Sequence, residues 1–148
     1  YHLLKADILD FMGDAVGKRK QIEAYLVKVS DINYGVMYHK YDVLLYAENI
    51  EKKEKALQIA AQEVSERPTA QSYDLLAWSY FKNGEIVKAL QIAENYVIDK
   101  SFEPEAMLHT AYILKANGNK EAANKLKEEL IKSLYELGPL AEDEILKI

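Results

Sequence analysis

The sequence predicts an all-α protein built as a stack of antiparallel helical hairpins, and three observations support this class. Apolar residues recur at helical spacing, part of the chain repeats with a period of about 33 residues, and Asn-Gly pairs mark regular turns. The alternation of apolar and polar residues that a half-buried strand needs is absent. A single hairpin cannot bury its apolar faces alone, so we expect the hairpins to share a continuous core.

Composition limits the classes of function that the chain can have. With 148 residues, 49% of them hydrophobic and 29% charged, it suits one globular domain. A formal net charge of −5 argues against binding to nucleic acid or to an anionic membrane surface, because both require a concentrated positive face. The chain has no cysteine, which excludes disulfides, thiolate metal sites and cysteine nucleophiles. No apolar run approaches the roughly 18 to 20 residues of a membrane-spanning helix, so we expect no membrane insertion.

The first third of the chain predicts one irregular hairpin over residues 1–35. Two apolar stripes flank a turn at Gly13-Asp14. Their members are Leu3, Leu4, Ile8, Leu9 and Met12 in the first stripe, and Ile22, Tyr25, Leu26 and Val29 in the second. The stripes have helical spacing, but the segment lacks the regular repeat found later, so we interpret it as a degenerate hairpin. Residues 30–35 are expected to form a connecting loop or a slack helix start.

The central part of the chain predicts three regular repeats, at 36–68, 69–102 and 103–136. The segment Ala56–Ala60 recurs one period later as Ala89–Ala93, and Gly84 recurs in the same way as Gly118. Asn83-Gly84 and Asn117-Gly118 place a glycine where the first helix of a hairpin must end and reverse. The prolines of Arg67-Pro68 and Glu103-Pro104 separate successive hairpins. We expect helices at about 37–49, 52–66, 69–82, 85–99, 104–116 and 119–136.

The end of the chain predicts a short capping helix over residues 139–148. Gly138-Pro139 breaks the preceding long helix, and Leu140, Ile145 and Leu146 stand among acidic residues. A terminal helix of this kind covers the open end of a repeat stack and keeps it soluble. The capping helix, the three repeats and the first hairpin together form a single domain spanning residues 1–148.

The repeats resemble the tetratricopeptide repeat, whose pattern places bulky, small and aromatic residues at set positions in two helices. The matching residues are Tyr73, Leu76, Ala77, Tyr80 and Ala89 in one copy, Met107, Ala111, Leu114 and Ala123 in the next, and Tyr41, Leu44, Ala56, Ala60 and Pro68 in the previous one. The segments 74–80 and 107–112 are also similar to the closing repeats of certain bacterial tetratricopeptide proteins. The resemblance implies a right-handed superhelix, with alanines where helices cross closely. Leu45 and Lys127 depart from the pattern.

The resemblance also implies a concave groove lined by the first helix of each repeat. Tyr46, Trp78 and Tyr112 occupy matching places there, and aromatics in such a groove can anchor a peptide. The other candidate groove residues are Asp42, Asp74, Phe81, Lys82, Leu108, His109 and Lys115. The aspartates would favour a ligand with basic residues. The alternative interpretation is that the aromatics are buried against the neighbouring hairpin and the charged residues are merely solvated.

Catalysis has little support in the sequence. His2, His39 and His109 are far apart, and the chain has neither a His-x-x-x-His metal motif nor a glycine-rich phosphate loop. We therefore expect no catalytic residues, no metal site and no cofactor. The acidic run Glu142-Asp143-Glu144 is interpreted as a solvated helix face.

These observations predict a non-catalytic scaffold or adaptor that binds a protein or peptide of unknown identity. One alternative is a sensor domain that binds a small molecule or signalling peptide and controls a missing N-terminal effector domain. Another is an assembly module with weak self-association through the terminal helix. Because the chain begins at Tyr1, we interpret it as a fragment. Its location, cytoplasmic or exported, then depends on what precedes Tyr1.

Overall fold

The computed structural model describes residues 1–30 and 36–148, and every regular element within these two ranges is a helix. The α-helices are α1 (His2–Phe11), α2 (Ala15–Val29), α3 (His39–Ala47), α4 (Lys53–Glu66), α5 (Ala70–Lys82), α6 (Ile86–Tyr96), α7 (Pro104–Ala116), α8 (Lys120–Leu130), α9 (Leu134–Leu137) and α10 (Ala141–Leu146). The 3₁₀ turns η2 (Ile50–Lys52) and η3 (Ile131–Ser133) precede α4 and α9. The all-α prediction is confirmed. The connection expected at 30–35 lies, from residue 31 on, outside the described residues.

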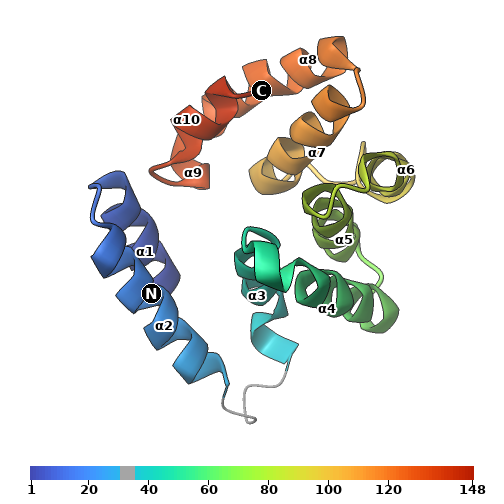
Figure 1. The fold of residues 1–148 in the computed structure, drawn as a ribbon. Helices are drawn as coiled ribbons and strands as arrows, with labels where there is room; N and C mark the ends of the chain where they lie inside the picture. Colours follow the sequence, from blue (N-terminus) through green and yellow to red (C-terminus); the bar gives the residue numbers. More distant parts are fainter. Residues whose placement is uncertain (31–35) are drawn as a thin grey trace.

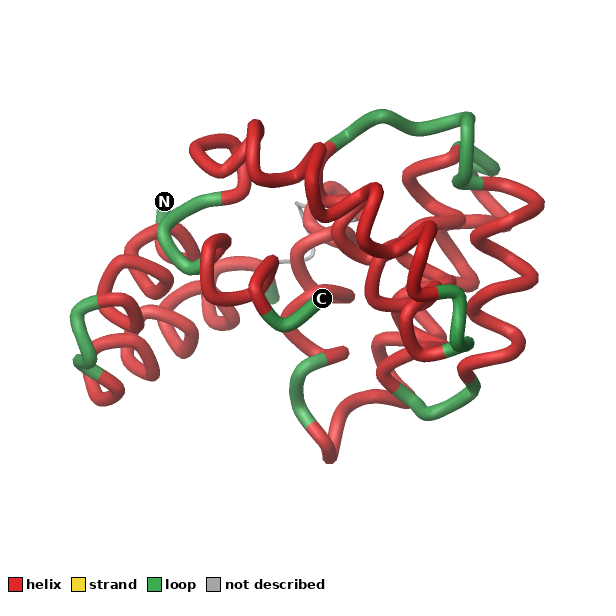
Figure 2. Tube along the Cα trace, turned by 90° about the horizontal axis from the view of Figure 1, so that it is seen from above, coloured by secondary structure: helices red, strands yellow, loops and turns green. Residues whose placement is uncertain are grey.

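Consecutive helices pair as hairpins, and the hairpins follow one another along a curve. The packed pairs are α1 with α2, α3 with α4, α5 with α6, and α7 with α8, while α3, α5 and α7 also contact in series. Figure 1 shows this curved path, with α9 and α10 turning back from α8 toward α1. The view from above in Figure 2 shows the α1/α2 hairpin projecting to one side of the other helices. The curve therefore has an inner side faced by both ends of the chain.

Two glycines end the first helices of successive hairpins in the same way. Gly84 and Gly118 have φ values of 89° and 86°, a region in which a side chain would be strained. In both turns the second residue after the asparagine donates its backbone N–H to a carbonyl of the last helical turn, Glu85 to Tyr80 and Asn119 to Leu114. This is the hydrogen-bond pattern of a helix that ends in a left-handed glycine. The predicted turns at Asn83-Gly84 and Asn117-Gly118 are confirmed.

Two of the six helices predicted in the repeats end earlier than expected. The helix predicted to reach residue 99 ends at Tyr96, because Val97 turns inward to 2% exposure and Asp99 takes a positive φ of 60°. The helix predicted over 119–136 ends at Leu130 and continues as the 3₁₀ turn η3 and the short helix α9. Neither break carries a glycine or proline at the point of interruption, so the sequence showed no stop signal there.

Alanines form the seams between paired helices. Ala77, Ala89 and Ala93 are buried together where α5 meets α6, and Ala111 and Ala123 are buried where α7 meets α8. Small residues let two helix backbones approach closely, and larger neighbours then fill the space beside the seam. Leu76, Tyr80 and Leu90, which the repeat pattern also placed in the core, are only half-buried. They lie beside the seams and keep one side exposed.

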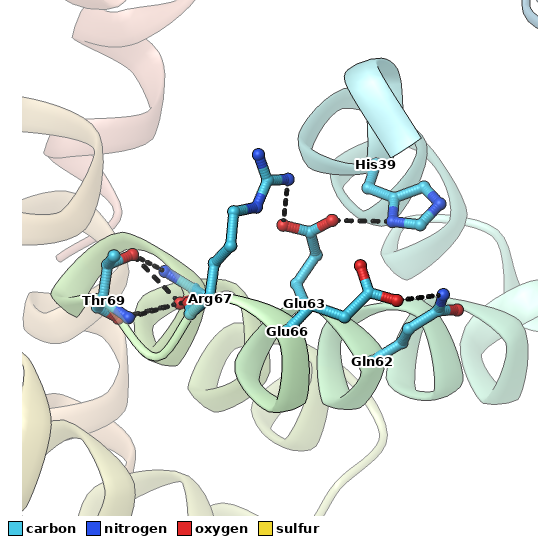
Figure 3. A network of polar contacts seen from close by, with 7 residues as sticks. His39, Gln62, Glu63, Glu66, Arg67 and Thr69 are labelled. Carbon is cyan, nitrogen blue, oxygen red and sulfur yellow. Dashed lines mark hydrogen bonds and ion pairs between the residues drawn. The ribbon is translucent and has the colours of Figure 1, made fainter. Parts of the chain in front are cut away.

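A buried carboxylate ties the start of α3 to the end of α4. Glu63 is 6% exposed, and its two oxygens accept hydrogen bonds from His39 Nδ1 and Arg67 Nη2, each at 2.7 Å. Figure 3 shows this pair of contacts beside the cap formed by Thr69 at the start of α5. Because both oxygens have partners, the desolvation cost of burying the charge is offset. His39 therefore has a structural role in the α3/α4 hairpin.

The C-terminal helix α10 packs on the inner side of the last hairpin. Ile145 and Ile148 are buried in one cluster with Leu108, Ala111 and Leu114, whereas Leu146 is 64% exposed. A helix is present where the terminal helix was predicted, and of its three expected apolar residues Ile145 is buried, Leu140 is half-buried and Leu146 is exposed.

Three side chains of α7 and α8 donate hydrogen bonds to backbone carbonyls at the end of α10. Tyr112 Oη donates to the Glu144 carbonyl at 2.8 Å, Lys115 Nζ to that of Lys147 at 2.5 Å, and Lys127 Nζ to that of Leu146 at 3.2 Å. Cations near a helix C-terminus also interact favourably with its dipole. Lys127, which departs from the repeat pattern, thus serves to cap α10.

Overpacking a seam should destabilise the protein. We expect Ala111→Leu, at a site with 0% exposure, to cost about 1 to 3 kcal/mol, because the added atoms force α7 and α8 apart. The exposed Ala116→Leu variant of the same helix is the control and should change stability by less than about 0.5 kcal/mol. Urea unfolding followed by circular dichroism measures both, and equal effects would contradict this account of the seam.

Removing the buried side chain of α10 should be costly. We expect Ile145→Ala to lower the free energy of unfolding by about 2 to 5 kcal/mol, because it leaves a cavity between α10 and α7. Leu146→Ala, on the exposed side of the same helix, should lie within about 0.5 kcal/mol of the wild type. If the two variants are equally stable, α10 is not docked as the structure has it.

Candidate binding cleft

A cleft of about 1210 Å³ lies on the inner side of the curve. The α1/α2 hairpin forms one wall, α3 and η2 form the facing wall, and the start of α7 with α9 and α10 closes the remaining side. Its lining combines residues from opposite ends of the chain, such as Leu4 and Leu140. The cleft therefore exists only when the chain has folded back on itself.

The lining of the cleft is mainly aliphatic. The apolar lining residues are Leu3, Leu4, Ala6, Ile22, Leu26, Leu44, Leu45, Ile50, Leu108, Leu137 and Leu140. Leu4 and Ile50 are 59% and 85% exposed, so a ligand could cover a large part of each side chain. Covering such a side chain completely contributes about 1.5 to 3 kcal/mol. The cleft thus offers binding energy to an apolar ligand face.

Carboxylates dominate the charged part of the lining. The acidic lining residues are Asp7, Asp10, Glu48, Glu51, Glu103, Glu105, Glu136 and Glu144, and the basic ones are Lys18 and Lys52. Desolvation raises the pKa of the Asp7 carboxyl, with Asp10 adding to the effect and Lys18 opposing it. Desolvation and the charge of Glu48 raise the pKa of Glu144 in the same way, while the charges of Lys147, His109 and Lys82 lower it by less. The cleft is therefore a region of negative potential.

Three of the ten predicted groove residues line this cleft, namely Tyr46, Leu108 and His109. Tyr46 and Trp78 are buried, at 8% and 7% exposure, so the alternative interpretation of burial against the neighbouring hairpin applies to both. The prediction that the aromatics line the groove is wrong for Trp78, which does not line the cleft, whereas the buried ring of Tyr46 does. The two rings pack together with Ala47 and Ala56 in one cluster between successive hairpins.

Trp78 is the centre of an aromatic stack that joins α5 to α7. The ring of His109 lies parallel to it, with centroids 4.2 Å apart, and the ring of Phe81 stacks at 5.1 Å. His109 Nδ1 lies 2.9 Å from Asp74 Oδ2, and both residues are buried. Asp74 and His109 were predicted separately as groove residues, and the structure brings them together as an ion pair under the tryptophan.

Competing effects set the pKa of His109. Burial lowers the pKa of His109. The Asp74 carboxylate raises it by a larger amount, through its charge and its hydrogen bond, so the net pKa lies above the ordinary value of 6.5. Glu105 also raises it and Lys40 lowers it. The buried pair therefore favours an imidazolium beside a carboxylate and ties the third hairpin (α5/α6) to the fourth (α7/α8).

The remaining predicted groove residues serve contacts within the chain. Asp42 accepts a hydrogen bond from Tyr25 Oη at 2.8 Å, which joins the first hairpin to α3. Lys82 Nζ lies 4.8 Å from the centre of the Trp78 ring and 2.8 Å from Glu48. Lys115 and Tyr112 hold the backbone of α10. These side chains form part of the wall behind the cleft and do not line the cleft themselves.

Most of the lining was not predicted from the sequence. The apolar and acidic residues of α1, η2 and α9 were assigned to a degenerate hairpin, a turn and the end of the last repeat helix. Asp7 and Asp10 are three positions apart, so the sequence does place them on one helix face. Nothing in the order of residues indicated that this face would lie opposite α3 and α9.

The described residues contain no helix long and apolar enough to cross a membrane and no group of three side chains placed to hold a metal ion. Comparisons of the chain with protein-family models, curated proteins and solved structures gave no match.

The Asp74–His109 pair should make stability depend on pH. Because folding raises the pKa of His109, the pair stabilises the fold fully below about pH 6.5, and this contribution is lost as pH rises through the folded pKa. We expect Asp74→Asn to cost about 1.5 to 3 kcal/mol at pH 6 and less at pH 9. Urea unfolding at several pH values tests this, with Glu121→Gln on the exposed face of α8 as control. A cost for Asp74→Asn that is constant with pH would contradict it.

Proposed function

We propose that this protein is a non-catalytic scaffold or adaptor that binds a segment of another protein in its inner cleft. The observation that carries the proposal is the lining itself, in which aliphatic side chains are accompanied by charged ones. Binding sites for protein segments combine an apolar centre with a polar rim in this way. The burial of Tyr46 and Trp78 moves the proposed contact surface from the α5/α7 wall to the space between α1, α3 and α9.

We also propose that the three regular hairpins are tetratricopeptide-type repeats stacked in a right-handed superhelix. The regular sequence period, the alanine seams and the matching glycine turns support this architecture. In such a stack the first helices α3, α5 and α7 follow one another along the inner side. The aromatic and ionic contacts among them would then give the cleft a rigid back wall.

The size of the cleft favours a protein segment over a small molecule. Pockets for small ligands usually measure about 300 to 1,000 Å³ and enclose most of the ligand. The cleft, at about 1210 Å³, is larger, and exposed side chains such as Ile50 stand at its rim. A sensor domain for a small molecule, which the sequence left as an alternative, is for this reason the weaker candidate.

Self-association through the terminal helix is also the weaker candidate. The apolar side chain that would mediate it, Ile145, is buried against the chain's own α7 with an exposure of 1%. Pairing with a second copy would first require α10 to leave this position.

Peptide selection can test the proposed site. A random peptide library would be selected on the folded chain, and recovered peptides would be measured against Leu4→Gln/Ile50→Gln, which makes two exposed lining residues polar. We expect affinity to fall at least about tenfold, because each substitution removes apolar contact worth about 1.5 to 3 kcal/mol when fully covered.

The matched control is Val27→Gln/Val87→Gln, which changes two exposed apolar residues outside the cleft. This control should bind the selected peptides as the wild type does. Peptides that bind all three proteins equally would place the binding surface elsewhere and overturn the proposal.

A further inference from the structure

We infer that the segment bound in the cleft is a cationic amphipathic helix of a partner protein. The inference rests on the proposed function and adds the chemistry of its ligand. It follows from three features of the described residues, which are the unbalanced carboxylates of the rim, their mutual repulsion, and the all-helical walls.

The first feature is a surplus of negative charge. Eight carboxylates line the cleft against two lysines, and both lysines already have partners. Lys18 Nζ lies 2.6 Å from Asp10, and Lys52 Nζ lies over the ring of Tyr46 at 5.2 Å. Glu48 and Glu105 are paired with Lys82 and Lys40.

The other carboxylates of the rim have no ion pair with another described residue. They are Asp7, Glu51, Glu103, Glu136 and Glu144. They belong to α1, η2, the start of α7, α9 and α10, so they surround the cleft from several directions. A partner's lysines or arginines could thus meet unpaired carboxylates on more than one wall.

The second feature is repulsion between carboxylates in the empty cleft. Desolvation is the main effect that disfavours the ionised forms of Asp7 and Glu144, and the neighbouring carboxylates of Asp10 and Glu48 add to it. A cationic side chain placed between such groups gains attraction and also relieves their repulsion. Complementary charge of this kind speeds association and discriminates against wrong partners more than it adds affinity. An anionic or uncharged segment would receive none of this benefit.

The third feature concerns the backbone of the ligand. An extended peptide usually binds by adding a strand to a sheet edge, and the described part of the chain offers only helices. A helix satisfies its own backbone hydrogen bonds and needs only a groove for its apolar face. The aliphatic floor, with Leu44, Leu45 and Leu108 on one side and Leu3 and Leu4 on the other, provides such a groove.

Designed peptides test this chemistry directly. Three labelled peptides of about 18 residues, which is five helical turns, would share one leucine stripe and carry lysine, glutamine or glutamate on the opposite face. We expect the lysine peptide to bind the whole chain at least about tenfold more tightly than the glutamine peptide, and the glutamate peptide to bind least. The affinity of the lysine peptide should also fall as the salt concentration rises, because salt screens the rim charges.

Charge-matched variants locate the effect. Glu51→Gln/Glu103→Gln/Glu136→Gln removes three exposed rim charges, while Glu94→Gln/Glu121→Gln/Glu128→Gln removes three exposed charges outside the cleft. We expect the rim variant to weaken the lysine peptide by about tenfold, and the outer variant to leave its affinity within about twofold of the wild type.

Two outcomes overturn the inference and are distinguishable from each other. Equal binding of the three peptides, or equal loss in the two charge variants, shows that rim charge does not select the ligand. If Leu4→Gln/Ile50→Gln still weakens binding in that case, the cleft remains the binding site and only the cationic ligand is rejected. If Leu4→Gln/Ile50→Gln has no effect on any peptide, the proposed function fails as well.

Discussion

The close contact of paired helices across alanine is the constraint on which the rest of this structure depends. Ala47, Ala56 and Ala60 serve α3 and α4, and equivalent alanines serve the next two hairpins. These contacts hold each hairpin as a unit, and the half-buried residues beside them reach across to the next hairpin. The α3, α5 and α7 side of the curve is built from this repeated geometry.

Polar and aromatic contacts then join one hairpin to the next. Tyr25 and Asp42 link the first hairpin to α3, and Asp74 and His109 link α5 to α7 beneath the ring of Trp78. Each contact is a hydrogen bond or stack that needs defined geometry, so it specifies how neighbouring hairpins are oriented as well as stabilising them. These contacts form the wall behind the cleft and leave few of these groups free for a ligand.

The last helix shows how the chain covers its own open end. On the inner side of the final hairpin, α10 buries Ile145 and Ile148, and Tyr112, Lys115 and Lys127 bind its last carbonyls. By taking that place, α10 also brings Glu144 and Leu140 to the cleft, so the cap forms part of the proposed site.

Local signals determined much of this fold. Helical spacing, Asn83-Gly84, Asn117-Gly118 and the prolines between hairpins predicted the helices of the repeats, because caps and turns depend on residues a few positions apart. The breaks after Tyr96 and Leu130 had no local signal. No local signal showed that the side chain of Trp78 would be buried and not exposed in a groove. Only the tertiary structure determined where the cleft lies, because its walls come from opposite ends of the chain. Whether these walls meet depends on how each hairpin is rotated relative to the preceding hairpin.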